Sequence, residues 1–319
     1  MVPATPPVSV TAGLRAERWR SRGRSARTFV RRFGARTDGV LGLVILVIFA
    51  VLAIAPQVFV GPFETVTTST GRSLEAPSAA HLFGTDELGR DLLNMTVHGA
   101  RISMSIGLMA TFITIFVGAL IGVISGFVGG RVDAALMRLT DFFLVLPTFV
   151  LAIILAPVIL DIIGVEAEIL GLRATLLVIV VVIGATSWAT TARIIRSQTL
   201  SIRERMFVDR ARVIGGGQGH IMRRHIFPNV VNLIVAQAVI TFAAAVFTET
   251  SLSFIGLGDP FAPSWGQILD SAQGSGAPGL GAWWYFVPPA ACVVLVVLSF
   301  TLVGNALDDI LNPKSRTRR

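Results

Sequence analysis

The chain has few charged residues and a single cysteine. Charged side chains make up 14% of its 319 residues, whereas hydrophobic side chains make up 53%. A soluble globular protein carries about 25% charged residues. With so few, the chain could not cover a surface that faces water, so lipid is its expected solvent. The one cysteine, Cys292, excludes a disulfide within the chain and a cysteine-based zinc site.

The motifs of nucleotide binding and hydrolysis are also missing. The only lysine, Lys314, is not part of a GxxxxGK pattern, so the chain cannot itself hold ATP phosphates through a P-loop lysine. There is no GxSxG nucleophile elbow, and the four histidines lack HExxH or any other ligand spacing. An intramembrane hydrolase would need a Ser/Lys, Ser/His or paired-Asp arrangement at membrane depth, and none is found. We therefore predict no catalytic residues, no cofactor and no metal site.

Six apolar stretches are long enough to cross a bilayer, whose core of about 30 Å needs about 20 helical residues. They are Val40–Val60, Ile102–Val128, Leu139–Leu160, Ala174–Ala192, Val230–Ile255 and Trp283–Leu307. Because 39 residues precede the first stretch, we expect a retained signal-anchor helix rather than a cleaved signal peptide. The predicted fold class is an all-α polytopic membrane protein with six transmembrane helices.

Basic residues are concentrated on one side of these stretches. Of the 27 Lys and Arg residues, 23 precede the first stretch or follow the second, fourth and sixth. The other four are Arg72, Arg90, Arg101 and Arg173. The positive-inside rule then places both termini in the cytoplasm. Topology thus accounts for the net charge of +8, and no nucleic-acid partner is expected.

The same pattern divides the chain into segments. Residues 1–37 are rich in Arg, Pro, Ser and Gly, so we predict a disordered cytoplasmic tail lying near anionic membrane lipid. The first transmembrane helix follows at 38–60, an external segment at 61–100 and a transmembrane core at 101–310. Residues 311–319 form a second cytoplasmic tail.

The cytoplasmic loop 196–228 is long, basic and still partly apolar. Met206, Phe207, Arg210, Val213 and Ile214 recur at helical spacing, which predicts an amphipathic helix from Glu204 to Ile214. The glycines at 215–217 would end it, because glycine accepts a left-handed cap. A second short helix is predicted at His220–Ile226, ending at Pro228. Such a loop could lie on the membrane surface or dock into another protein.

Residues 207–228 resemble the EAA loop of ABC-importer permeases, in which Glu-Ala-Ala precedes a glycine and, thirteen residues later, a proline. Asp209, Arg210 and Ala211 stand in the Glu-Ala-Ala positions, and Gly215 and Pro228 have the required spacing. The sequence departs from the pattern at Asp209, Arg210, His225 and Phe227. The resemblance implies that this is the coupling loop, docked in a cleft of the cytoplasmic ATPase. Its candidate contact residues are Phe207, Asp209, Arg210, Ala211, Gly215, His225 and Pro228.

Three further segments narrow the family. Residues 81–108, 137–153 and 248–269 are similar to those of C-type dipeptide, oligopeptide and nickel permease subunits, and the resemblance covers residues 38–313. It implies a type I ABC-importer permease fold in the cytoplasmic (inner) membrane. It also implies a second homologous permease, ABC ATPase subunits and an external or periplasmic substrate-binding protein. Di- or oligopeptides are the implied substrates, with nickel, glutathione or another small solute as alternatives.

An acidic cluster precedes the second apolar stretch. Asp86, Glu87 and Asp91, which lie beside Arg90 in the sequence, could bind a cation. By the family resemblance, Asp86, Arg90 and Asp91 could instead contact an external partner. Thr85 or Asp86 is expected to cap the following helix, because both side chains accept free amide protons.

Two acids and three hydroxyls within the stretches are candidates for a translocation path. Asp141 lies near the inner interface and Glu249 near the outer one, so neither reaches the midplane. An ion-coupled carrier, which needs a central carboxylate, is therefore disfavoured. Ser187, Thr190 and Thr191 share one helix face, which could line the path or pack against a neighbouring helix.

Overall fold

The computed structural model describes residues 30–164, 167–169 and 172–311, so most of the predicted tail 1–37 and the tail from 312 lie outside it. Its helices are α2 (Thr37–Ile54), α3 (Pro56–Val60), α4 (Leu92–Val128), α5 (Gly130–Val145), α6 (Thr148–Ile163), α7 (Ala174–Arg203), α8 (Met206–Val213), α9 (Gln218–Ile221), α10 (Phe227–Leu252), α11 (Trp265–Gly274) and α12 (Trp283–Leu311). A π-helical segment, Met222–Ile226, joins α9 to α10, and a kinked segment, Ser253–Leu257, follows α10. Two short strands, β1 (Glu168–Ile169) and β2 (Leu172–Arg173), pair antiparallel.

Within these residues, five single helices and one bent pair are long and apolar enough to cross a bilayer, as six spans require. The single helices are Thr37–Ile54, Leu92–Val128, Ala174–Arg203, Gln218–Leu257 and Trp283–Ile310. The bent pair is α5 with α6. The predicted six-span helical fold is therefore confirmed.

The third span differs from the single helix predicted at Leu139–Leu160. It consists of α5 and α6, whose axes are bent by 89° at a break over Leu146 and Pro147. The proline ring disfavours the helical conformation of the residue before it, and Leu146 is extended at φ −77° and ψ 128°. The proline also lacks the N–H that a continuous helix would use.

The first two spans begin or end elsewhere than predicted. Helix α2 stops at Ile54, and Pro56 opens α3 at a position where a missing N–H costs nothing. Helix α4 begins at Leu92, well before Ile102, because the side chain of Asp91 accepts the N–H of Asn94 at 2.9 Å. The first turns of α4 mix polar with apolar residues and are buried, with Leu92 and Met95 packed against α11 and α12, which hydropathy alone does not reveal.

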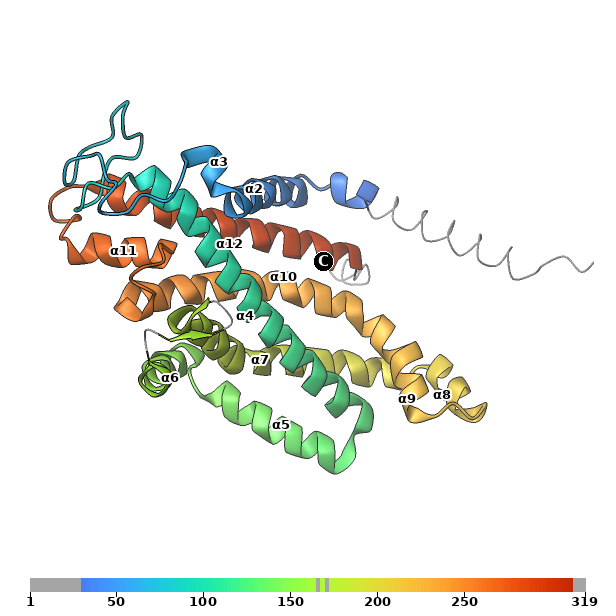
Figure 1. The fold of residues 1–319 in the computed structure, drawn as a ribbon. Coiled ribbons are helices and arrows are strands. Elements are labelled where there is room, and N and C mark those ends of the chain that lie inside the picture. Colours follow the sequence, from blue (N-terminus) through green and yellow to red (C-terminus); the bar gives the residue numbers. More distant parts are fainter. Residues whose placement is uncertain (1–29, 165–166, 170–171, 312–319) are drawn as a thin grey trace, which may run out of the picture.

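Helices α4 and α7 pack with their backbones unusually close. A methyl group at Gly118 would lie 2.7 Å from Cβ of Thr191, and one at Gly126 would lie 2.7 Å from Cβ of Thr199. At Gly122 it would lie 2.6 Å from the carbonyl oxygen of Ala192. Glycines four residues apart occupy one face of a helix and let another helix approach, as in membrane helix pairs. The two helices therefore form the centre of the bundle (Figure 1).

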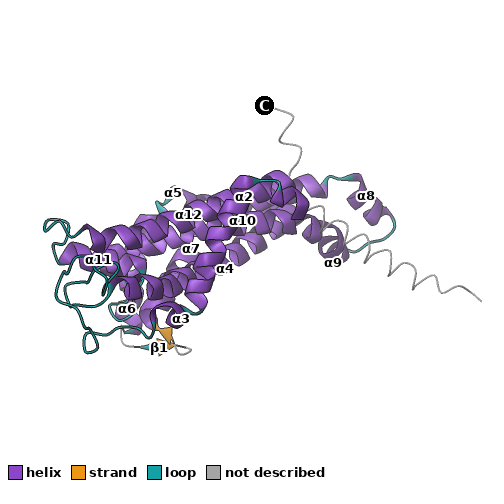
Figure 2. Ribbon diagram, turned by 90° about the horizontal axis from the view of Figure 1, so that it is seen from above, coloured by secondary structure: helices purple, strands orange, loops and turns teal. Residues whose placement is uncertain are grey.

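The two ends of the bundle carry different structures. Helix α11 and the loops around it lie at one end, and α8 with α9 project from the other, in both views (Figures 1 and 2). The start of α2 is joined to the end of α12 by an ion pair between Arg36 and Asp309. Both helices point these ends toward α8 and α9 (Figure 1). The segments assigned to the cytoplasm by their basic residues thus share one end of the molecule.

Candidate functional site: the basic helical loop and the external segment

Helix α8 has one buried and one exposed face. Val208 and Ala211 face inward and belong to an apolar cluster with Ile202, Ile221 and Ile226. This cluster fixes α8 to the ends of α7 and α10. The small Ala211 was expected to let a partner approach, but it lies inside the molecule and serves internal packing instead.

The outer face of α8 and its end is apolar and is not covered by any other residue that the structure describes. Met206 is 73% exposed, and Val213 and Ile214 are 87% and 84% exposed. Phe207 is also exposed, and its ring lies 6.1 Å from that of His225. The predicted helical stripe is therefore present, but four of its members point away from the protein. A contiguous apolar surface of this kind marks an interaction site.

Gly215 ends this helix in the conformation that the sequence predicted. Its φ is +85°, in the left-handed region that a side chain disfavours, and no atom lies within 4 Å of a Cβ placed there. The N–H of Gly216 then donates to the carbonyl oxygen of Ala211 at 2.9 Å. A glycine is therefore needed at position 215 because of the backbone conformation, and not because another part of the structure comes close.

The second short helix of the loop does not end at Pro228, contrary to prediction. Helix α9 continues through Met222–Ile226 into α10, so Gln218–Leu257 forms one long helical span. The wider π-helical turn lies next to Pro228, which occupies the first turn of α10. Because the span continues through this turn, the proline leaves one backbone hydrogen bond to the preceding turn unmade, and a local π-helical adjustment is a known way to accommodate it.

The charged groups of the loop face solvent. Asp209 pairs with Arg212 at 3.1 Å on the surface, and Arg210 is exposed beside them. Arg223, Arg224 and His220 line an open cavity of about 800 Å³ that also touches Pro228. The loop therefore offers an apolar patch bordered by basic side chains, which suits a partner surface with an apolar groove and carboxylates.

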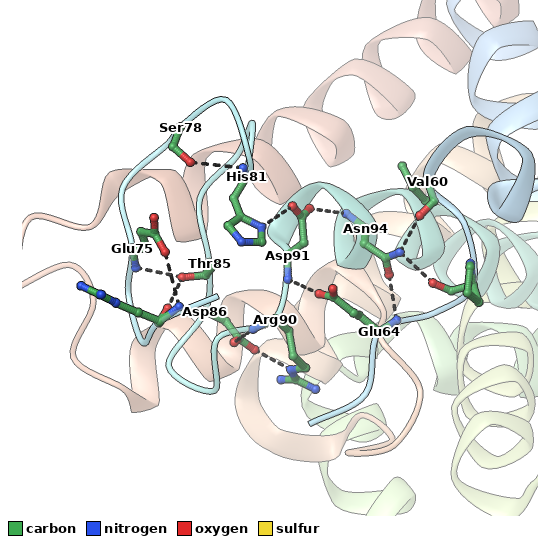
Figure 3. A network of polar contacts seen from close by, with 12 residues as sticks. Val60, Glu64, Glu75, Ser78, His81, Thr85, Asp86, Arg90, Asp91 and Asn94 are labelled. Carbon is green, nitrogen blue, oxygen red and sulfur yellow. Dashed lines mark hydrogen bonds and ion pairs between the residues drawn. The ribbon is translucent and has the colours of Figure 1, made fainter. Parts of the chain in front are cut away.

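In the external segment, the predicted acidic cluster holds its own loop together (Figure 3). Asp86 accepts the backbone N–H of Arg90 at 2.7 Å and its Nε at 2.6 Å. Asp91 lies 2.9 Å from Nδ1 of His81 and caps α4. The cap is therefore Asp91, not Thr85 or Asp86 as expected, because Asp86 is fully committed to the turn before the helix.

These contacts leave little of the cluster for a partner. Asp86 is buried, and Arg90 and Asp91 are mostly covered. The exposed side chains of the segment are a mixture of polar ones, such as Thr67, Thr70 and Arg72, and apolar ones, such as Val66 and Leu82. Among the described residues, no three His, Cys, Asp or Glu side chains converge on a point that could hold a metal ion.

The candidate path residues are dispersed. Asp141 pairs with Arg193 at 2.5 Å on an exposed surface. Glu249 is completely buried and accepts hydrogen bonds from Ser253 at 2.9 Å and Thr250 at 3.4 Å. Thr191 is buried against Gly118, whereas Ser187 is half-buried and Thr190 exposed. For Thr191 and Glu249 burial favours packing, whereas Asp141, Ser187 and Thr190 keep exposed or half-buried side chains and stay candidates for the path.

Two features escaped the sequence analysis. Asp133 of α5 forms a two-pronged ion pair with Arg196 of α7, with distances of 2.6 and 2.7 Å. A cavity of about 630 Å³ opens between α4 and α7, lined by apolar side chains together with Gln57, His98 and Arg101. The ion pair joins segments 63 positions apart, and a cavity depends on packing, so neither leaves a local pattern in the sequence.

These features define a polytopic, α-helical membrane protein with a basic helical loop projecting from one end. The family model of binding-protein-dependent transport system inner membrane components matches residues 118–317, and the chain belongs to this family. This membership confirms the resemblance drawn from the loop and the flanking segments.

Relatives of known name match over most of both chains. The chain is 36% identical over 290 residues to the dipeptide transport system permease protein DppC of Bacillus subtilis, covering 90% of this chain and 85% of the relative. It is 34% identical to the oligopeptide transport system permease proteins OppC of Bacillus subtilis (89% and 88% covered) and of Haemophilus influenzae (90% and 88% covered).

A solved structure has the same fold. A chain of the MetNI methionine ABC transporter, in an inward-facing conformation, matches with a TM-score of 0.53 and 18% identity. The match covers 69% of this chain and 95% of the solved chain. At this identity the likeness concerns the fold, which is that of an ABC-importer permease.

Proposed function

We propose that the chain is the permease subunit of an ATP-driven importer that moves di- or oligopeptides into the cell across the cytoplasmic membrane. The observation that carries the proposal is the uncovered apolar face of α8, bordered by Arg210, Arg212 and Arg223. The names of the relatives, which are dipeptide and oligopeptide permeases, support the substrate class.

In this proposal the loop 196–228 docks on a cytoplasmic ATPase through α8 and the residues that follow it, not through the end of α7, and both chain termini lie on that side. A second, homologous permease completes the pathway, and an external binding protein delivers the peptide. ATP binding closes the ATPases and moves α8 with them, and the paired permeases then open outward. The chain performs no covalent chemistry, because its task is to couple a movement to the opening of a path.

The same architecture could import nickel, glutathione or another small solute, since the binding protein largely selects the cargo. Deleting the gene and measuring uptake of a toxic, membrane-impermeant peptide analogue separates these substrates. We expect resistance to the peptide and normal nickel uptake. If the deletion strain stayed sensitive to the peptide analogue and lost nickel uptake, nickel would be the proposed substrate instead.

A further inference from the structure

Helix α8 is attached firmly to the pair formed by α4 and α7. Only Glu204 and Arg205 separate the end of α7 from the start of α8. Beneath α8, Val208 and Ala211 share one apolar cluster with Val123 and Phe127 of α4 and with Ile195 of α7. A displacement of α8 must therefore carry the adjoining ends of α4 and α7.

Arg203, in the last turn of α7, strengthens this attachment. Its Nη1 donates to the carbonyl oxygens of Gly126 and Phe127, at 3.3 Å each. These carbonyls belong to the last turn of α4, where helical partners are missing and a cation is favourable. Together with the close packing of Gly118, Gly122 and Gly126, the contact makes α4, α7 and α8 one mechanical unit.

Helix α5 is held to this unit in a different way. Thr140 is its only fully buried residue, and its apolar contact with α7 lies at its far end, where the ring of Phe143 is 5.2 Å from that of Trp188. The first turns of α5 depend on polar contacts instead. The best-formed contact is the pair of Asp133 with Arg196, at 2.6 and 2.7 Å, and Ser125 of α4 donates a third hydrogen bond to the same carboxylate. Ser125 is completely buried, and Asp133 is mostly shielded from water. Two-pronged Arg–carboxylate pairs fix orientation as well as distance.

A second ion pair between α5 and α7 provides an internal comparison. Asp141 and Arg193 are both more than half exposed and share a single contact at 2.5 Å. Such exposed pairs contribute little, since water competes for both charges. Beyond Asp141 the span breaks at Pro147, and α6 is held separately by apolar contacts of Ala152 and Ala156 with α7.

We infer that the Asp133–Arg196 pair is the joint that transmits a movement of α8 to α5, and so to the inner half of the bent third span. The inference rests on the proposed function, because it assumes that the ATPase moves α8. Asp133 and Arg196 are positioning residues: they need contact neither peptide nor ATPase. Without the joint, α8 would still dock and move, but the first turns of α5, which lie away from the Phe143 contact, would no longer follow.

The test uses the complete importer, with its ATPases, second permease and binding protein, reconstituted in liposomes. Asp133→Asn and Arg196→Gln should lower the peptide imported per ATP hydrolysed by about tenfold, the factor expected from one charge-assisted hydrogen bond. Association with the ATPase and basal ATP hydrolysis should stay within about twofold of wild type, because α8 is untouched. The swapped variant, Asp133→Arg with Arg196→Asp, should recover part of the loss. Asp141→Asn, the matched control, should keep wild-type coupling.

A spectroscopic arm tests the joint without relying on transport. In a Cys292→Ser background, spin labels at Ser201 on α7 and at the exposed Val132, beside Asp133 on α5, report the distance between the two helices at the ion pair. We expect a narrow distribution in wild type, the same with and without trapped nucleotide, and a broad one in Asp133→Asn. Equal distributions in wild type and Asp133→Asn would overturn the inference, as would full coupling in that variant. If wild-type complexes showed no peptide-stimulated hydrolysis, the proposed function would fail, while the distance distributions would still decide on the joint.

Discussion

The indole N–H of Trp265 donates to the carbonyl oxygen of Thr96 at 2.9 Å, joining residues 169 positions apart. Trp265 is completely buried, and its backbone N–H also donates to Ser103 of α4 at 3.1 Å. Its ring meets that of Phe49 edge-on, with centroids 5.6 Å apart. One side chain at the start of α11 thus ties this helix to α4 and α2.

Replacing Trp265 should therefore destabilise the subunit. Trp265→Ala removes a large buried side chain and should cost about 3–5 kcal/mol. Trp265→Phe keeps most of the volume and loses only the hydrogen bond to the Thr96 carbonyl, which keeps its partner within α4, so it should cost about 0.5–1.5 kcal/mol. The thermal stability of the detergent-solubilised subunit can be measured by fluorescence-detected size exclusion. Wild type should be the most stable, Trp265→Phe less stable and Trp265→Ala the least stable. The control is Trp283→Ala, because Trp283 is exposed. If Trp283→Ala lost as much thermal stability as Trp265→Ala, this account would be contradicted.

The close contact of α4 with α7 predicts a strong effect of size at Gly122. A leucine there would collide with the Ala192 carbonyl and with Ile195. Overpacking of this kind costs about 1–3 kcal/mol even when neighbours can adjust, and a backbone atom adjusts poorly. Membrane levels of Gly122→Leu should fall well below those of Gly274→Leu, where nothing lies within 4 Å. Equal levels would mean that the helices are not packed as described.

The sequence predicts well where local chemistry decides the outcome. Span number follows from runs of apolar residues, because a bilayer demands them whatever the neighbours are. The glycines after α8 predict its end, since the backbone conformation at Gly215 is a local requirement. The EAA-like spacing from Gly215 to Pro228 predicts the family.

The sequence predicts poorly where distant contacts decide. Asp91, Asp86 and Thr85 are all acceptable caps by composition, and only the folded turn assigns Asp86 to Arg90 and leaves Asp91 for α4. The Ala211 side chain faces the interior because an apolar cluster lies beneath α8, and residues of other helices form most of that cluster. The pair of Asp133 with Arg196 joins two different spans, so no periodicity reveals it.

Gly215→Leu should abolish transport while leaving the subunit in the membrane. The left-handed backbone at φ +85° penalises a side chain, so the end of α8 would rearrange and its docking face with it. Gly217→Leu is the matched control, because Gly217 has φ −64° and equally open surroundings. Pull-down of the ATPase and peptide-stimulated hydrolysis are the measurements. If both variants behave as wild type, this loop is not the coupling loop.

A charge on the exposed face of α8 should separate docking from folding. Val213→Asp places a carboxylate in water in the free subunit, so its folding stability should change by less than about 0.5 kcal/mol. In the docked complex the charge would be buried without a partner, which costs several kcal/mol and weakens binding more than about tenfold. Asp209→Ala, which removes an exposed ion pair, should have only a mild effect of about 0–1 kcal/mol. ATPase pull-down, with thermal stability measured in parallel, checks both variants, and undiminished binding of Val213→Asp would contradict the docking surface.

The central claim is that this chain couples ATP hydrolysis to peptide import, and one reconstitution addresses it directly. Liposomes containing this subunit, its homologous partner and the ATPases receive the peptide-loaded binding protein, and labelled peptide inside is counted against ATP hydrolysed. The account predicts that peptide accumulates only with ATP and that hydrolysis rises when the loaded binding protein is added. Omitting this subunit should abolish both. Peptide accumulation at full rate without it, or ATP-driven accumulation of nickel but not of peptide, would contradict the account.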